Sequence, residues 1–137
     1  MRTTILVAED DRLGALLARQ VLGDAGWSVD VAVDGDEAIE RLRAAPERYA
    51  LALLDLVMPG ADITEVIDAA QRLRPALPVV LTSGYPEDFV RERLRGRTID
   101  GFVSKPWEVA PLLATLRRAL DARPAGCGQA RGTDDPG

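Results

Sequence analysis

Residues 5–21 read ILVAEDDRLGALLARQV and join two different hydrophobic patterns. The first four residues form an uninterrupted apolar run, which predicts a buried strand. Apolar residues then recur at helical spacing, at Leu13, Leu16, Leu17 and Val21. A buried strand followed at once by an amphipathic helix is typical of the repeating units of a parallel sheet, so this stretch predicts an α/β fold.

The same alternation continues along the chain. Four further strands are predicted at residues 27–33, 51–54, 79–82 and 101–104. The remaining helices are predicted around residues 38–42, 63–73, 86–95 and 109–122. Together these elements predict a doubly wound, five-stranded parallel sheet of the flavodoxin-like (βα)₅ type. The second strand alternates strictly between apolar and polar side chains, as a half-exposed edge strand does, which favours the strand order 2-1-3-4-5.

The chain has room for one domain. Its 137 residues are 47% hydrophobic, which is enough to form a core. We assign the domain to residues 1–122. Residues 123–137 are rich in glycine and proline and lack apolar periodicity, so they predict a disordered C-terminal tail.

Composition excludes several classes of function. The chain has no histidine, which rules out histidine-based catalysis and histidine metal ligands, and its single cysteine, Cys127, rules out an internal disulfide. The net charge of −5 argues against direct nucleic-acid binding. No apolar run approaches the roughly 20 residues that span a bilayer, and no signal peptide precedes the first strand. We therefore expect a cytoplasmic protein that does not contact membranes.

Acidic residues gather where two predicted strands end. Glu9, Asp10 and Asp11 follow the first strand, and Asp55 follows the third. Neighbouring parallel strands lie about 4.8 Å apart, so these carboxylates are expected to converge at the carboxyl edge of the sheet. Like charges at such distances repel, and a hard divalent cation relieves the conflict. The cluster therefore predicts a Mg²⁺ site, which would attract an anion such as a phosphoryl group.

Two other strand ends carry groups suited to phosphoryl oxygens. Ser83 follows the fourth strand and offers a hydroxyl, and Lys105 follows the fifth and offers an ammonium. Lys105 is also the only lysine among 17 basic residues. Four different residue types at four strand ends on one edge are difficult to obtain by chance, so we interpret them as one functional site.

Four motifs occur in order along the chain. They are ILVAED (5–10), LLDLVMPG (53–60), PVVLTSGY (78–85) and GFVSKP (101–106). In these motifs the sequence resembles the receiver domains of bacterial two-component response regulators. The resemblance covers about residues 3–122.

The resemblance implies a phosphorylation site and its metal. Asp55 matches the aspartate that accepts a phosphoryl group from a phosphohistidine on a sensor histidine kinase or a histidine phosphotransfer protein. The implied Mg²⁺ ligands are Glu9, Asp10, Asp55 and the backbone carbonyl of Val57, with Glu9 acting through water. Because Asp11 makes a third consecutive acid, the direct ligand is left open between Asp10 and Asp11.

The resemblance also implies a switch. Lys105 matches the lysine that pairs with the phosphoryl group, and the Lys105–Pro106 peptide would be cis. Ser83 matches the hydroxyl that turns toward the phosphoryl group. Phe102 matches the aromatic residue that moves into the space that Ser83 leaves.

The implied output surface is formed by helix 86–95, strand 101–104 and helix 109–122. Such a protein is not an enzyme that turns over external substrates, since it catalyses only its own phosphorylation and dephosphorylation. Trp107 stands where phenylalanine is usual and is not expected to touch the chemistry. The sequence leaves open the cognate kinase, the target, the oligomeric state, and whether this is a stand-alone regulator or a receiver from a larger protein such as a hybrid kinase.

Three alternative functions share this fold class. A flavodoxin-like FMN-binding module needs a phosphate loop after the first strand, where the acids at 9–11 would repel phosphate. An aspartate-nucleophile phosphohydrolase needs a second acid two residues after the nucleophile, where Val57 stands. A degenerate receiver used only for docking does not need an intact set of polar residues at the strand ends. Their presence here argues against this alternative; they are Glu9, Asp10, Asp55, Ser83 and Lys105.

A cluster of arginines raises the question of an RNA-binding or partner-binding patch. Arg91, Arg93, Arg95 and Arg97 interleave with acidic residues in and after the fourth predicted helix. This pattern favours a solvated helix face over an RNA-binding or partner-binding patch.

Overall fold

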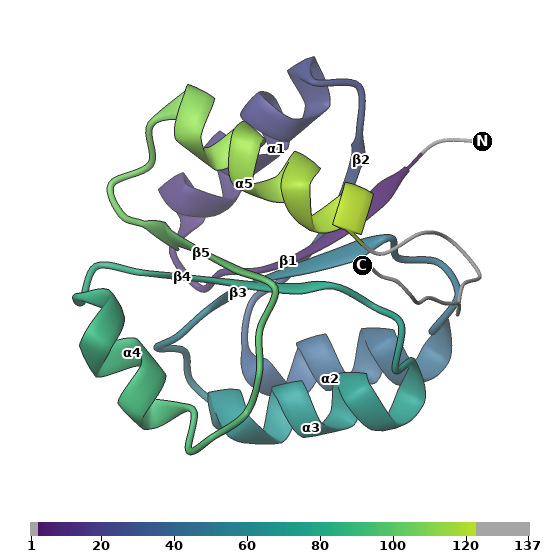
Figure 1. Ribbon diagram of the computed structural model, residues 1–137. Helices are drawn as coiled ribbons and strands as arrows, with labels where there is room; N and C mark the ends of the chain where they lie inside the picture. The colour runs from purple at the N-terminus through teal and green to yellow at the C-terminus, as the bar shows by residue number, and fades with distance from the viewer. Residues whose placement is uncertain (1–2, 123–137) are drawn as a thin grey trace.

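The computed structural model describes residues 3–122 and shows one parallel sheet between two layers of helices (Figure 1). The strands are β1 (Thr4–Ala8), β2 (Ser28–Ala32), β3 (Leu51–Asp55), β4 (Val79–Ser83) and β5 (Gly101–Ser104). The helices are α1 (Arg12–Asp24), α2 (Gly35–Ala44), α3 (Ile63–Leu73), α4 (Glu87–Arg93) and α5 (Val109–Ala122). All neighbouring strands are parallel, in the order β2-β1-β3-β4-β5, which confirms the predicted fold class and topology. The predicted tail at 123–137 lies outside the described residues.

The sheet is covered on both faces. Helices α1 and α5 lie on one face and α2, α3 and α4 on the other (Figure 1). Each face has its own apolar cluster, so the central strands β1, β3 and β4 are buried along their whole length. Strand β2 is half-buried at the edge of the sheet, as its alternating sequence predicted.

Helix α1 buries a different face from the one that its leucines suggested. Leu13 and Leu16 are 75% and 60% exposed, whereas Ala18 and Leu22 are fully buried against the sheet. The apolar spacing predicted the helix correctly, but the leucines give it a second apolar face that points outward. Burial on a helix is decided by which face meets the sheet, and periodicity alone does not decide this.

The loops after β2 and β3 brace one another near the carboxyl edge of the sheet. Asp34 caps α2 by accepting a hydrogen bond from the backbone N–H of Glu37. The backbone N–H of Gly35 donates to the carbonyl of Pro59, and a Cβ at Gly35 would lie 2.2 Å from the carbonyl oxygen of Ala61. Glycine at position 35 therefore allows the loop after Asp55 to pack closely on α2.

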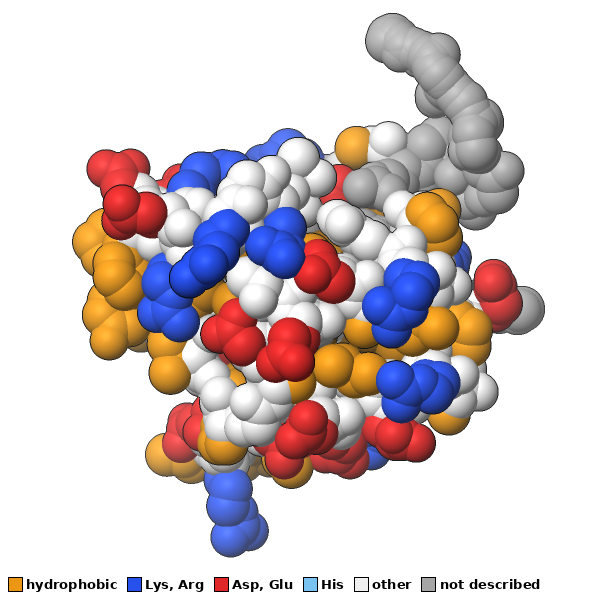
Figure 2. Space-filling view, turned by 90° about the horizontal axis from the view of Figure 1, so that it is seen from below, with side chains coloured by type: hydrophobic (Ala, Val, Ile, Leu, Met, Phe, Trp, Pro, Cys, Tyr) orange, Lys and Arg blue, Asp and Glu red, His pale blue; other side chains and the backbone are white. Residues whose placement is uncertain are grey.

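The arginines around α4 are largely ion-paired. Arg91, Arg93 and Arg97 pair with Glu87, Asp62 and Asp68, respectively. Figure 2 shows the face of α2, α3 and α4, where acidic and basic side chains are interspersed and form no single basic patch. This arrangement favours the interpretation of a solvated face.

Candidate phosphoacceptor site

The predicted acidic cluster assembles at the carboxyl edge of the sheet. Ala8 pairs with Leu54 in the β1–β3 register, so the next residues, Glu9 and Asp55, lie side by side. Ligand oxygens of Glu9, Asp10 and Asp55 all lie within 4.8 Å of one another. Glu9 and Asp55 are only 2% and 7% exposed, whereas Asp10 is exposed to solvent. The cluster thus combines two buried carboxylates with one that is open to water.

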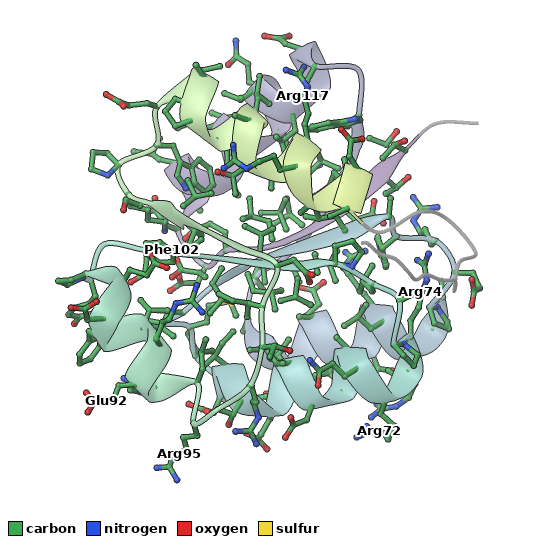
Figure 3. The ribbon with its side chains drawn as sticks, viewed as in Figure 1. Arg72, Arg74, Glu92, Arg95, Phe102 and Arg117 are labelled. Atoms are coloured by element: carbon green, nitrogen blue, oxygen red, sulfur yellow. The ribbon has the colours of Figure 1, made fainter. Side chains whose placement is uncertain are left out.

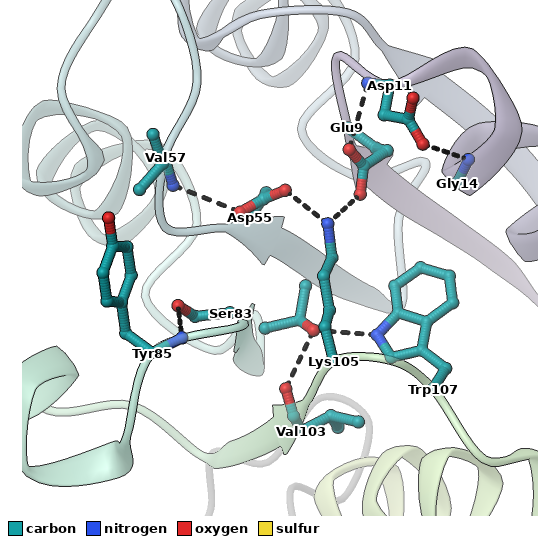
Figure 4. Close-up of polar contacts among 11 residues, drawn as sticks. Glu9, Asp11, Gly14, Asp55, Val57, Ser83, Tyr85, Val103, Lys105 and Trp107 are labelled. Carbon is teal, nitrogen blue, oxygen red and sulfur yellow. Dashed lines mark hydrogen bonds and ion pairs between the residues drawn. The ribbon is translucent and has the colours of Figure 1, made fainter.

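Lys105 joins this cluster from β5. Its Nζ donates to Glu9 Oε1 at 2.6 Å and to Asp55 Oδ2 at 2.7 Å (Figure 4). Its backbone N–H donates to the carbonyl of Ser83, which fixes the residue beside the end of β4. The Lys105–Pro106 peptide is cis, as the resemblance implied. The one lysine of the chain therefore forms the ion pairs at the centre of the site.

The charges in the cluster are not balanced. Three carboxylates face one ammonium, which leaves an excess of negative charge. Burial raises the pKa of Glu9, and the nearby Asp55 carboxylate acts in the same direction, while the Lys105 hydrogen bond opposes them. Burial lowers the pKa of Lys105, but the bonds to Asp55 and Glu9 outweigh it, so the net shift is upward and the ammonium stays charged.

The two neighbouring acids, Asp10 and Asp11, have different local roles. Asp11 caps α1, because its Oδ2 accepts a hydrogen bond from the backbone N–H of Gly14 at 2.9 Å. Its own backbone N–H donates to Glu9 Oε2 at 3.0 Å. Gly14 leaves room for Glu9, since a Cβ there would lie 3.0 Å from Glu9 Cδ. Asp10 has no such capping role in the described structure and is the acid that converges with Glu9 and Asp55.

The donor set of the cluster fits a hard divalent cation. It consists only of carboxylate oxygens, with no nitrogen or sulfur ligand among them. One member is open to solvent, as Mg²⁺ requires in order to keep some of its waters. Glu9, Asp10 and Asp55 are therefore the residues that could hold the metal. The backbone carbonyl of Val57 stays a predicted ligand, and the described contact of Val57 is its N–H donating to Asp55 Oδ1 at 3.2 Å.

The two predicted switch residues lie beside the site. Ser83 is 2% exposed, and its Oγ accepts a hydrogen bond from the backbone N–H of Tyr85 at 2.9 Å. Phe102 is half-buried on β5 and packs against the apolar cluster that includes Val90 and Leu94 around α4 (Figure 3). In this structure Ser83 is thus bonded toward the β4–α4 loop, and Phe102 packs on the α4 side of the sheet.

Sequence reasoning missed the contacts of Trp107. We expected it to lie apart from the chemistry, but its ring centroid is 5.8 Å from Lys105 Nζ, and its Nε1 donates to Thr82 Oγ1 at 2.8 Å. The position two residues after Lys105 was the available signal. A single sequence could not show that Trp107 would contact both Lys105 and Thr82, which lies on another strand.

Comparisons with known proteins identify the family. Residues 5–117 match the response regulator receiver domain family. The chain belongs to this family. Response regulators receive phosphoryl groups from histidine kinases, and the receiver domain is the part that accepts them.

Several relatives of this receiver domain are regulatory proteins. It is 38% identical over 124 residues to the transcriptional regulatory protein TctD of Salmonella typhimurium, covering 89% of this chain and 53% of that protein. It is 34% identical over 122 residues to the response regulator MprA of Mycolicibacterium vanbaalenii, covering 88% of this chain and 51% of that protein. The chain thus spans about half the length of these relatives.

Solved structures give the same assignment. A CheY-like receiver domain protein from Methanospirillum hungatei has a TM-score of 0.80 and 25% identity, covering 90% of this chain and 97% of that one. A response regulator receiver protein from Sinorhizobium medicae has a TM-score of 0.79 and 27% identity, covering 90% and 98%. Within residues 3–122 of this receiver domain, no helix has the length and apolar character needed to cross a membrane.

Proposed function

We propose that this receiver domain accepts a phosphoryl group on Asp55 from a phosphohistidine of a sensor histidine kinase or a histidine phosphotransfer protein. The observation that carries the proposal is the pair of 2.6 and 2.7 Å bonds by which Lys105 bridges Glu9 and Asp55 inside the acidic cluster. A buried carboxylate between an ammonium and a potential cation site is arranged for anion transfer.

The transfer is a displacement at phosphorus. An oxygen of the Asp55 carboxylate forms a bond to phosphorus as the bond from phosphorus to the imidazole nitrogen of the donor breaks, and the electron pair leaves with the imidazole. The product is an acyl phosphate on Asp55. The Val57 N–H, 3.2 Å from Asp55 Oδ1, and Lys105, 2.7 Å from Oδ2, hold the carboxylate in one orientation.

Neutralisation of charge is the main catalytic requirement. Glu9, Asp10, Asp55 and the carbonyl of Val57 would hold Mg²⁺, which when bound supplies positive charge for the phosphoryl oxygens. Lys105 supplies a second positive charge, 2.7 Å from Asp55 Oδ2. With these groups the protein would catalyse its own phosphorylation and dephosphorylation and no reaction of an external substrate.

The new phosphoryl group would then move the switch. Its oxygens would accept a hydrogen bond from the Ser83 hydroxyl, whose Oγ accepts a bond from the Tyr85 N–H in this structure. Phe102, half-buried on β5, would move into the space that Ser83 leaves. The signal would reach a protein target on the surface formed by α4, β5 and α5.

Phosphorylation with a small donor tests this function directly. Incubation with acetyl phosphate and Mg²⁺ should add one phosphoryl group that hydroxylamine removes, as measured by intact mass. Asp55→Asn should not be labelled. The matched control is Asp34→Asn, because the hydrogen bond that the Asp34 side chain accepts is the cap of α2, and asparagine caps about as well. Full labelling of Asp55→Asn would place the acceptor elsewhere and overturn the proposal.

A further inference from the structure

Trp107 is fixed in place by a buried hydroxyl. Its indole Nε1 donates to Thr82 Oγ1 at 2.8 Å, and that hydroxyl in turn donates to the carbonyl of Val103 at 2.8 Å. Thr82 is 1% exposed, and the indole is half-buried against the apolar cluster under α1 and α5. The hydrogen bond and the packing together set the plane of the ring.

The fixed ring faces the lysine of the site. Lys105 Nζ lies 5.8 Å from the ring centroid, which is within the range of a cation–π contact. The ammonium is therefore held by Glu9 and Asp55 and also contacts the indole of Trp107 (Figure 4). A lysine side chain is long and flexible, so an additional neighbour reduces the number of positions that the ammonium can adopt.

We propose that Trp107 is a positioning residue that holds the Lys105 ammonium at the phosphoacceptor site. The inference rests on the proposed function, since it assigns Trp107 a role in the same transfer. Thr82 directly precedes Ser83, and the Lys105 N–H is bonded to the Ser83 carbonyl. The indole is thus linked to the end of β4 that has to change when Ser83 moves.

The first consequence is a spectroscopic signal. The chain has two tryptophans, and Trp27 lies before β2, at the opposite end of the sheet, with Arg117 over its ring. In a Trp27→Phe variant, emission comes from Trp107 alone. Adding Mg²⁺ should change that emission in a saturable way, because a cation bound by Glu9 and Asp55 competes with their bonds to Lys105.

Matched variants identify the source of the signal. Trp27→Phe combined with Lys105→Met should lose the Mg²⁺ response, since the ammonium over the indole is gone. Trp107→Phe, which keeps only Trp27, should show no response. The proposal would be overturned if the emission of Trp107 in the Trp27→Phe protein did not change at Mg²⁺ concentrations that raise the melting temperature of that protein.

The second consequence is kinetic. Trp107→Leu removes both the ring and the indole N–H. It should slow labelling by acetyl phosphate by about two- to fivefold, which is the rate change that corresponds to the free energy of a partly exposed cation–π contact. Trp107→Phe should lose less, because it keeps a ring. The Mg²⁺ concentration at half-maximal thermal stabilisation should not rise in either variant, since the carboxylates are intact and the competing ammonium is held less firmly.

The effect of the Thr82 hydroxyl can be tested separately. Thr82→Val keeps the shape of the side chain and should reduce the rate in the same direction as Trp107→Leu, whereas Thr82→Ser should retain the native rate. Native-rate labelling of Trp107→Leu would overturn the positioning role. Failure of the native protein to be labelled at Asp55 would instead overturn the proposed function, so the two failures are distinguishable.

Discussion

Replacing Asp10 by asparagine should make the metal-free protein more stable. Oxygens of Glu9, Asp10 and Asp55 lie within 4.8 Å of one another, and the Lys105 ammonium pairs with two of these three carboxylates, Glu9 and Asp55. Two charges at that distance repel by about 1 kcal/mol in bulk water and by about 3 kcal/mol at an effective dielectric constant of 20. Asp10 is exposed, so the lower value applies to it.

The expected gain follows from this arithmetic. Asp10 faces two like charges, and the Lys105 ammonium offsets about one of them. Asp10→Asn should therefore raise the free energy of unfolding by about 1 kcal/mol in EDTA. With Mg²⁺ at about 100 times its Kd, the native protein should gain about 2.7 kcal/mol through binding, whereas the variant should gain much less. The order of stability of the two proteins should thus reverse when Mg²⁺ is added.

Urea denaturation in EDTA and in Mg²⁺, followed by circular dichroism, measures both values. Asp11→Asn is the matched control, because asparagine caps a helix about as well as aspartate does. It should keep the full Mg²⁺ response. An Asp10→Asn protein that is no more stable than native in EDTA, or that gains as much from Mg²⁺, would refute the reasoning. Loss of the response in Asp11→Asn would move the metal ligand to Asp11.

Four other substitutions have defined outcomes. Lys105→Arg should fold normally and still accept a phosphoryl group from acetyl phosphate. The larger, planar guanidinium should fail to support the change at Ser83 and Phe102, so the chemical shifts of α4 should no longer respond to phosphorylation. Gly35→Ala should destabilise the protein by about 2 kcal/mol or more in urea, because its Cβ would lie 2.2 Å from a carbonyl oxygen of the β3–α3 loop. Gly23→Ala, in open space within α1, should instead stabilise it by about 0.5–1 kcal/mol. The Arg48 hydrogen bond lowers the pKa of Asp30, so this pair should contribute stability above about pH 4 and lose it as the pH falls through the lowered pKa. The difference in stability between native and Arg48→Ala proteins should shrink accordingly below that pH, and a difference that grows on acidification would contradict the pairing.

Patterning along the chain was sufficient to predict the fold. Short apolar runs alternating with helical periodicity gave ten elements, and their order and the edge position of β2 are as predicted. Parallel sheets are covered on both faces, so their strands are recognisable by composition alone. The geometry of parallel sheets also predicted that the strand-end residues Glu9, Asp55, Ser83 and Lys105 share one edge of the sheet.

The sequence could not determine which face of α1 would be buried, or which of two neighbouring acids would converge with Glu9 and Asp55. The leucines of α1 have the spacing of a buried stripe, yet Ala18 and Leu22 meet the sheet, because burial depends on how the helix docks. Asp10 and Asp11 are the same residue type, and their difference arises only because α1 begins at Arg12 and uses Asp11 as its cap.

The contact between Trp107 and Lys105 depends on tertiary structure in the same way. The sequence by itself determined the elements, their order and the residue types at the strand ends, because these follow from local periodicity and the geometry of parallel sheets. Only the folded chain decided which hydroxyl bonds the indole and where the ammonium sits, since Thr82 and Trp107 are 25 residues apart and Lys105 and Glu9 are 96 apart. Contacts between residues so distant in the chain depend on side-chain packing across strands, and a pattern read along one sequence does not contain that information.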